Sequence, residues 1–206
     1  KCVYVYSGGM QHHIDTQKQY ISIKNSFDPK LYQLIADHNG FIAGGAISSL
    51  FTKRKINDYD IYFPEEAGTE ALNAYLNNTK NWTNEYNSNF SHTYKNKNGV
   101  ALIDPLEYGK THIVGEMKIQ CINAFYGEVQ DIFNTFDFHC CMGAFTFKTN
   151  EFTFDPFFLT DNMSRILRYN YDGAANPLTT LFRVEKYKSY GRSEERRVGK
   201  ECRSRW

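Results

Sequence analysis

The stretch that decides the fold is FIAGGAISSLFTKRKINDYDIYF, residues 41–63. The apolar FIA predicts a buried strand, Gly44-Gly45 predicts a tight turn, and AISSLF predicts a short helix. The next segment, DYDIYF, alternates in the manner of a strand, so Asp58 and Asp60 are expected on the same face of it. The pattern is a strand, a glycine turn, a helix and a second strand that carries paired carboxylates.

The paired carboxylates and the glycines together indicate phosphate chemistry. Two carboxylates a few ångströms apart repel each other unless a cation lies between them, and a hard divalent cation suits oxygen ligands. Glycines let backbone N–H groups approach a phosphate closely. We therefore expect Asp58 and Asp60 to be catalytic ligands of Mg²⁺ or Mn²⁺, with Gly44 and Gly45 beside a bound nucleoside triphosphate. Each half of the pattern is common alone, so the prediction rests on their conjunction.

This conjunction resembles the signature of the nucleotidyltransferases of the DNA polymerase β superfamily. At a greater distance the chain resembles the head of the tRNA CCA-adding and bacterial poly(A) polymerase group. That group has GGAVRD where this chain has GGAISS, and its ribose-binding motif is similar to FDFHCCMGAF, with Asp137 at the position of the motif's aspartate. A later motif of the group is similar to Asp155-Pro156-Phe157 and Leu167-Arg168. The first helix of the group's neck is similar to PLTTLFRVEKYKSYG, residues 177–191. All these motifs come in the same order in this chain. The chain resembles nucleotidyltransferase-like proteins of large bacteriophages more closely still.

The resemblance implies an α+β fold with a small mixed sheet flanked by helices, over residues 1–175, and the start of a helical neck over residues 176–191. It implies a metal-dependent enzyme that moves a nucleoside monophosphate from a nucleoside triphosphate to a hydroxyl acceptor, with RNA, including tRNA, as one candidate. Ser48, Ser49, Lys53 and Asp137 would then bind the nucleotide together with the glycines. The alternative is a catalytically silent nucleotide- or RNA-binding module of the same fold.

The chain departs from the group in three places. Ser48 replaces an arginine, Thr135-Phe136 replaces an arginine pair, and the expected third carboxylate falls near Gln120. An amide is a poorer ligand than a carboxylate for a hard cation. Either Glu116 or Asp104 substitutes for it, or two carboxylates suffice, or catalysis has been lost.

Two further sets of residues have two interpretations each. Lys53, Arg54 and Lys55 could contact a triphosphate or an RNA backbone, or form a solvated loop. His139 could be a catalytic base beside the nucleotide, or a packed, hydrogen-bonded histidine.

Composition excludes several classes of protein. The net charge is +1, from 24 basic and 23 acidic residues, which gives no argument for binding nucleic acid over the whole surface. The five cysteines are an odd number with two adjacent, which indicates a reducing compartment and lacks the separated pairs of a zinc site. No apolar run reaches the roughly 20 residues of a membrane span. We expect a cytoplasmic protein, in a bacterial host if a phage encodes it, whose true start precedes Lys1.

The remaining elements are predicted from periodicity and turn signals. Residues 1–27 are expected to be loop or edge strand, and residues 80–99 a long loop around a weak strand. A hairpin is expected around residues 148–150. Helices are expected at 28–39, 65–78, 127–136, 162–170 and 176–191, and strands at 100–105 and 117–125.

The last fifteen residues, 192–206, read RSEERRVGKECRSRW. They resemble, residue for residue, the conceptual translation of a short-read sequencing adapter, and their dense charge breaks from the preceding composition. We therefore expect them to be foreign to the natural chain, which would continue beyond Gly191, and to make few contacts.

Overall fold

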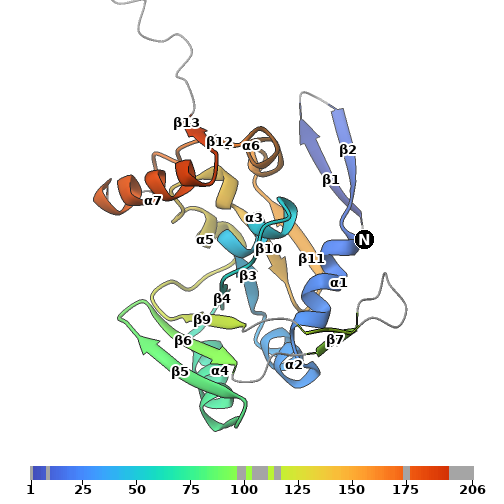
Figure 1. Ribbon diagram of the computed structural model, residues 1–206, viewed down its shortest axis with the longest axis vertical. Coiled ribbons are helices and arrows are strands. Elements are labelled where there is room, and N and C mark those ends of the chain that lie inside the picture. The colour runs from blue at the N-terminus through green and yellow to red at the C-terminus, as the bar shows by residue number, and fades with distance from the viewer. Residues whose placement is uncertain are drawn as a thin grey trace, which may run out of the picture.

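A seven-stranded mixed sheet forms the centre of the computed structural model, which describes residues 2–7, 10–96, 101–103, 111–113, 117–173 and 177–194 (Figure 1). The strand order is β11-β10-β3-β4-β9-β6-β5; β4 and β9 run parallel, and the other neighbours run antiparallel. The strands are β3 (Phe41–Ala43), β4 (Tyr59–Tyr62), β5 (Trp82–Asn87), β6 (Ser91–Asn96), β9 (Lys118–Ile122), β10 (Gly143–Thr146) and β11 (Glu151–Phe154). The expected α+β architecture with a mixed sheet is confirmed.

Helices and three small strand pairs complete the described chain. The helical segments are α1 (Gln17–Ser26), α2 (Pro29–Asp37), α3 (Gly45–Phe51), α4 (Glu66–Asn78), α5 (Val129–Phe133), the 3₁₀ turn η1 (His139–Cys141), α6 (Phe158–Ser164) and α7 (Pro177–Ser189). The strand pairs are β1 (Cys2–Ser7) with β2 (Met10–Asp15), β7 (Ala101–Ile103) with β8 (Thr111–Ile113), and β12 (Ile166–Leu167) with β13 (Ser193–Glu194). Among these described helices, none has the length and apolarity needed to cross a membrane.

One face of the sheet packs on α2 and α4 and holds the main core. Ile61 of β4 and Ile119 of β9 are fully buried on this face. The α2 helix forms as its sequence predicts: the Asp28 side chain accepts hydrogen bonds from the backbone N–H groups of Lys30 and Leu31, at 3.1 and 3.0 Å, and caps the helix. Burial of residues at period two on β4 leaves the alternate residue, Asp60, on the other face.

The opposite face is only partly covered. Ile132 and Phe133 of α5 pack on it against Phe41 and Tyr62, in a second and smaller apolar cluster. In Figure 1, α5 lies beside β3 and β4, α7 lies beyond the end of the sheet next to β12 and β13, and the β5–β6 hairpin extends away from both helices. Asp60 therefore lies between a covered and a less covered part of the same face.

Three predictions of secondary structure were wrong. Residues 82–96 form a hairpin with one irregularity, rather than a long loop around a weak strand, because a strand at the sheet edge needs few apolar residues and β5 buries only Trp82. Residues 17–26 form the helix α1, whose sequence shows little apolar periodicity. In the expected helix at 162–170, α6 ends at Ser164, Arg165 takes a left-handed conformation with φ 55°, and β12 comes next.

The start of the adapter-like segment makes contacts, contrary to expectation. Arg192 is buried, and its guanidinium donates hydrogen bonds to the Asp161 carbonyl, the Ser48 hydroxyl and the Asn162 side chain. Ser193 lies in β13, which pairs with β12. Residues 195–206 lie outside the described residues. The proposed division between residues 175 and 176 stays a prediction.

Candidate active site

The carboxylates and the glycine turn meet as the sequence predicts. Asp60 lies in β4 and Asp58 directly before it, while β3 runs antiparallel to β4 and ends at the turn. Gly44 has φ 92° and ψ −139°, a left-handed conformation that side chains rarely adopt. A Cβ atom built on Gly44 would lie 3.8 Å from Oδ2 of Asp60. The positive φ therefore explains the glycine at this turn, while the space beside Asp60 would admit a Cβ at ordinary contact distance.

Asp60 lies in a site that disfavours the charged form of its carboxyl group. Its Oδ1 atom is buried and accepts no hydrogen bond. Burial, followed by the neighbouring Asp58 carboxylate, raises the pKa of Asp60 from 3.8 to about 7, against the opposing effect of Arg183 and Lys186. A buried anion without a hydrogen-bond donor is unstable unless it is protonated or binds a cation.

Gln120 occupies the place where the third carboxylate was expected. It pairs with Asp60 in the register between β9 and β4, and its Nε2 donates a hydrogen bond of 3.0 Å to Oδ2 of Asp58. The two proposed substitutes, Glu116 and Asp104, lie outside the described residues. Within the described residues no cluster of three or more His, Cys, Asp or Glu side chains could hold a metal. Among the described residues, the oxygen-bearing side chains that meet here are two carboxylates and one amide.

A small cavity of about 60 Å³ lies beside Asp58, between α3 and α7. Four residues that the sequence predicted for the site line it: Gly45, Ser48, Ser49 and Asp58. The Ser48 hydroxyl is already engaged, because it donates a hydrogen bond of 2.6 Å to Oδ1 of Asn162. Ser49 is therefore the more available hydroxyl of the two.

The basic run contributes one residue to this cavity. Arg54 lines the cavity, and its guanidinium carbon lies 3.4 Å from the centroid of the Tyr190 ring. Lys53 is exposed and does not line the cavity. Arg54 is therefore placed where it could contact phosphate. Lys53 has the exposure expected of a solvated loop.

The sequence analysis missed the contribution of α7 to this cavity. Lys186 and Tyr187 of α7 line it, and so does Tyr190, the first residue after the helix. Their spacing of one, three and four residues places them on one side of a helix, which is the signal that could have identified them. The expectation of a helix at this position is confirmed, but its role beside the carboxylates was not predicted.

Asp137, the predicted ribose-binding residue, lies under α7. Its Oδ2 forms an ion pair of 3.3 Å with Nε of Arg183, and burial raises the pKa of Asp137 while Arg183 opposes the rise. Next to it, Sγ of Cys141 lies 2.9 Å from the Tyr187 hydroxyl. A hydrogen bond from Cys140 lowers the pKa of Cys141, and Arg183 adds to this effect. These contacts fix α7 to the segment that carries Asp137.

His139 is hydrogen-bonded within the fold. Its Nδ1 lies 2.9 Å from Oδ1 of Asp155, and its ring packs edge-on against Phe157. Oδ1 of Asp155 also accepts the backbone N–H of Phe157, at 2.9 Å. The geometry agrees with the interpretation of His139 as a packed, hydrogen-bonded side chain.

Comparison with known proteins gives a family and a fold. The profile of the Gabija anti-defense 2 protein family matches residues 13–165. The protein named Gabija anti-defense 2 from Bacillus phage SPbetaL7 is 37% identical over 159 residues, which are 77% of this chain and 35% of the phage protein. This chain therefore spans little more than a third of that relative.

Solved structures of CCA-adding enzymes share the fold. One in complex with ATP has a TM-score of 0.59 and 15% identity, covering 91% of this chain and 43% of its own. The Thermotoga maritima enzyme complexed with tRNA has a TM-score of 0.54 and 14% identity, covering 92% of this chain and 44% of its own. The predicted likeness to nucleotidyltransferase heads is confirmed at the level of the fold.

Proposed function

Because the chain belongs to the Gabija anti-defense 2 family, we propose that it is an anti-defense protein that acts as a metal-dependent nucleotidyltransferase. The proposed reaction joins the α-phosphate of a nucleoside triphosphate to a hydroxyl acceptor and releases pyrophosphate. The observation that carries the proposal is the buried, unpartnered Oδ1 of Asp60 beside Asp58 and the Gly44 turn. Such an arrangement costs stability in the absence of a cation, so its presence favours a functional role.

The residues present fit a hard divalent cation such as Mg²⁺ or Mn²⁺. Asp58 and Asp60 would hold it through carboxylate oxygens, and the phosphates of the nucleotide would complete its ligands. When bound, the cation would neutralise charge on the transferring phosphoryl group. Gln120 would keep Asp58 in position through its hydrogen bond.

The nucleoside triphosphate, which donates the nucleotide, would bind on the side of the carboxylates where the glycine turn lies. Gly44 and Gly45 let the phosphates approach the backbone, and Arg54 and Lys186 supply positive charge. Asp137 would contact the ribose. The cavity of about 60 Å³ is smaller than the roughly 300 Å³ of ordinary small-molecule sites, so nucleotide binding would require it to widen.

The direct test is nucleotide transfer by the purified protein. We expect label from α-phosphate-labelled nucleoside triphosphates to enter host RNA in the presence of Mg²⁺ or Mn²⁺, and to be lost in Asp58→Asn. The matched control is Asp37→Asn, which removes an exposed carboxylate from α2 and should leave transfer unchanged. In cells, phage plating on a host that carries the Gabija defence should depend on Asp58 in the same way.

The second candidate is a silent nucleotide- or RNA-binding module, which Gln120 and Ser48 favour because each replaces a charged residue of the related enzymes. Nucleotide binding that is equal with and without Mg²⁺, and unchanged in Asp58→Asn, would establish this candidate. The same result would reject the enzyme.

A further inference from the structure

The order of strands determines from which side an acceptor can reach the carboxylates. Phosphoryl transfer needs the attacking and leaving oxygens roughly in line. The donor phosphates, as proposed above, lie on the side of β3 and α3, so pyrophosphate leaves on that side. The attacking hydroxyl must therefore come from the other side of β4, where β9, β6 and β5 are the next strands of the sheet.

On that side the sheet has a row of side chains that leads away from the site. Gln120 pairs with Asp60, Thr93 pairs with Gln120, and Tyr86 pairs with Thr93, so all four point to one face. With neighbouring strands about 4.8 Å apart, Tyr86 lies about 14 Å from Asp60. A short bound polymer whose end lies at Asp60 can therefore reach Tyr86 along the surface of the sheet.

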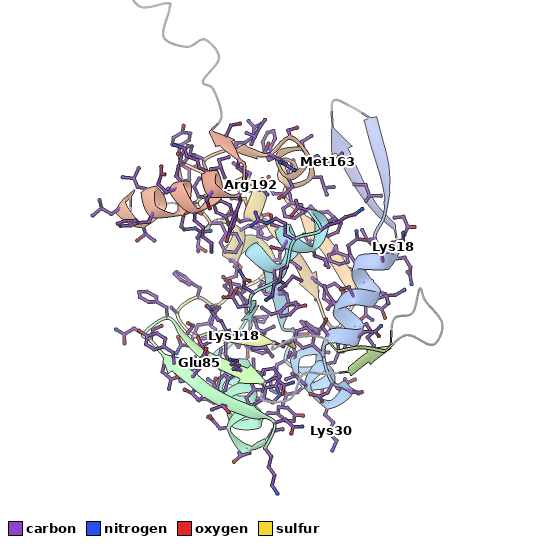
Figure 2. The ribbon with its side chains drawn as sticks, in the orientation of Figure 1. Lys18, Lys30, Glu85, Lys118, Met163 and Arg192 are labelled. Atoms are coloured by element: carbon purple, nitrogen blue, oxygen red, sulfur yellow. The ribbon has the colours of Figure 1, made fainter. Side chains whose placement is uncertain are left out.

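Tyr86 is the outermost residue of this row and is 65% exposed, so its ring is accessible to a partner. Lys118 lies two positions before Gln120 on β9 and pairs with Lys95 of β6, so both lysines share this face. Lys118 forms an ion pair of 2.6 Å with Glu85, which lies in the irregularity between the paired residues of β5 (Figure 2). The face thus combines an exposed ring with two cations beside the catalytic carboxylates.

We propose that this face of β9, β6 and β5 binds the acceptor, and that the acceptor is a single-stranded polynucleotide whose terminal hydroxyl is placed at Asp58 and Asp60. This proposal rests on the proposed function. A base would stack on the ring of Tyr86, because every base offers an aromatic face, and Lys118 and Lys95 would contact the phosphates. A polypeptide acceptor has no repeating anions for the lysines, and its side chains gain less from a single exposed ring.

Binding of a fluorescent, unstructured single-stranded RNA, measured by anisotropy without nucleotide or metal, tests the surface apart from catalysis. We expect Tyr86→Ala to weaken binding about tenfold, while Tyr86→Phe, which keeps the stacking face, retains it. Lys118→Gln should reduce the steepness of the salt dependence by about 0.7 in the log–log slope, and Glu85→Gln should tighten binding by removing the competing anion. Lys30→Gln, which changes an exposed lysine of α2, a helix that packs on the other face of the sheet, is the matched control (Figure 2). Residues 195–206 carry five cations but are common to all variants, so only differences between variants count.

The outcomes separate this proposal from the one on which it rests. Transfer of nucleotide that depends on Asp58, together with equal RNA binding by all variants, overturns the acceptor surface and leaves the enzyme intact. Label that enters a host protein and not RNA also overturns it, in favour of a protein acceptor. If the unaltered protein transfers no nucleotide but binds RNA in a way that depends on Tyr86, the enzyme is rejected and the single-strand-binding surface is retained.

Discussion

At the scale of single residues, Asp60 sets the pH dependence of stability. Its pKa is raised to about 7 in the folded protein from an ordinary 3.8, so the folded state binds the proton more tightly than the unfolded chain. Stability is therefore highest below about pH 4 with respect to this group, and falls as pH rises towards 7. Because the residue is partly exposed although its Oδ1 is buried, the loss is at most about 4 kcal/mol.

We therefore predict that Asp60→Asn stabilises the metal-free protein at pH 8 by a few kcal/mol and has little effect near pH 4. Urea unfolding at the two pH values measures this difference. Added Mg²⁺ should stabilise the unaltered protein at pH 8 and not Asp60→Asn. An equal effect of the substitution at both pH values would show that the carboxyl is not perturbed by its site.

Gln120 offers a second prediction at this scale. Gln120→Glu replaces a hydrogen-bond donor, 3.0 Å from Oδ2 of Asp58, with a like charge. We expect a loss of about 2 kcal/mol of stability without metal, and tighter binding of Mn²⁺, because a third carboxylate is added to the site. Calorimetry with and without Mn²⁺ measures both effects. Gln120→Leu, which removes the hydrogen bond without adding charge, should lose stability but gain no metal affinity.

Sequence reasoning predicted the position of the carboxylates because period-two spacing and the glycine turn are local signals. It also located Gln120 at the expected third position. It could not show that Ser48 is engaged by Asn162, because that contact joins residues 114 positions apart. The same holds for Lys186 on α7, whose approach to the cavity depends on packing in three dimensions.

At the scale of elements, the turn between β3 and α3 gives a matched pair of substitutions. Gly44 has φ 92°, so Gly44→Ala should cost about 1–3 kcal/mol of strain. A Cβ atom on Gly45 meets nothing within 4 Å, so Gly45→Ala should leave stability nearly unchanged. Thermal unfolding compares the two. If the phosphates approach this turn closely, Gly45→Ala should still weaken nucleotide binding, which titration of a fluorescent nucleotide would measure.

The elements that could be predicted are those whose signals are local. The α2 helix has its cap at Asp28 and a clear apolar side, and the β10–β11 hairpin has a turn around Asn150, whose φ is 56°. The β5–β6 hairpin was missed because β5 lies at the sheet edge and buries only Trp82, so its polar residues do not alternate with apolar ones. Its long-range support comes from the pairing of β6 with β9 and from Trp82 and Tyr94 in the main core, which no local pattern describes.

At the scale of the whole molecule, removing residues 195–206 and removing residues 192–206 should have different effects on stability. We predict that ending the chain after Glu194 leaves thermal stability unchanged. Ending it after Gly191 removes the buried Arg192 together with β13, and leaves the Ser48 and Asn162 side chains with fewer partners, at a cost of about 1–3 kcal/mol. Equal stability of the two truncated chains would show that the contacts of Arg192 and β13 together contribute nothing.

The parallel pairing of β4 with β9 has a consequence for the order of folding. It joins Asp60 to Gln120, sixty positions apart, and the chain between them must form the β5–β6 hairpin. Closing a long loop costs entropy before its contacts can repay it, so nearby strands pair first and this pair forms late. During synthesis, the carboxylates thus acquire their final neighbours only after β9 has left the ribosome. We expect a nascent chain that stops before β9 to bind neither metal nor nucleotide.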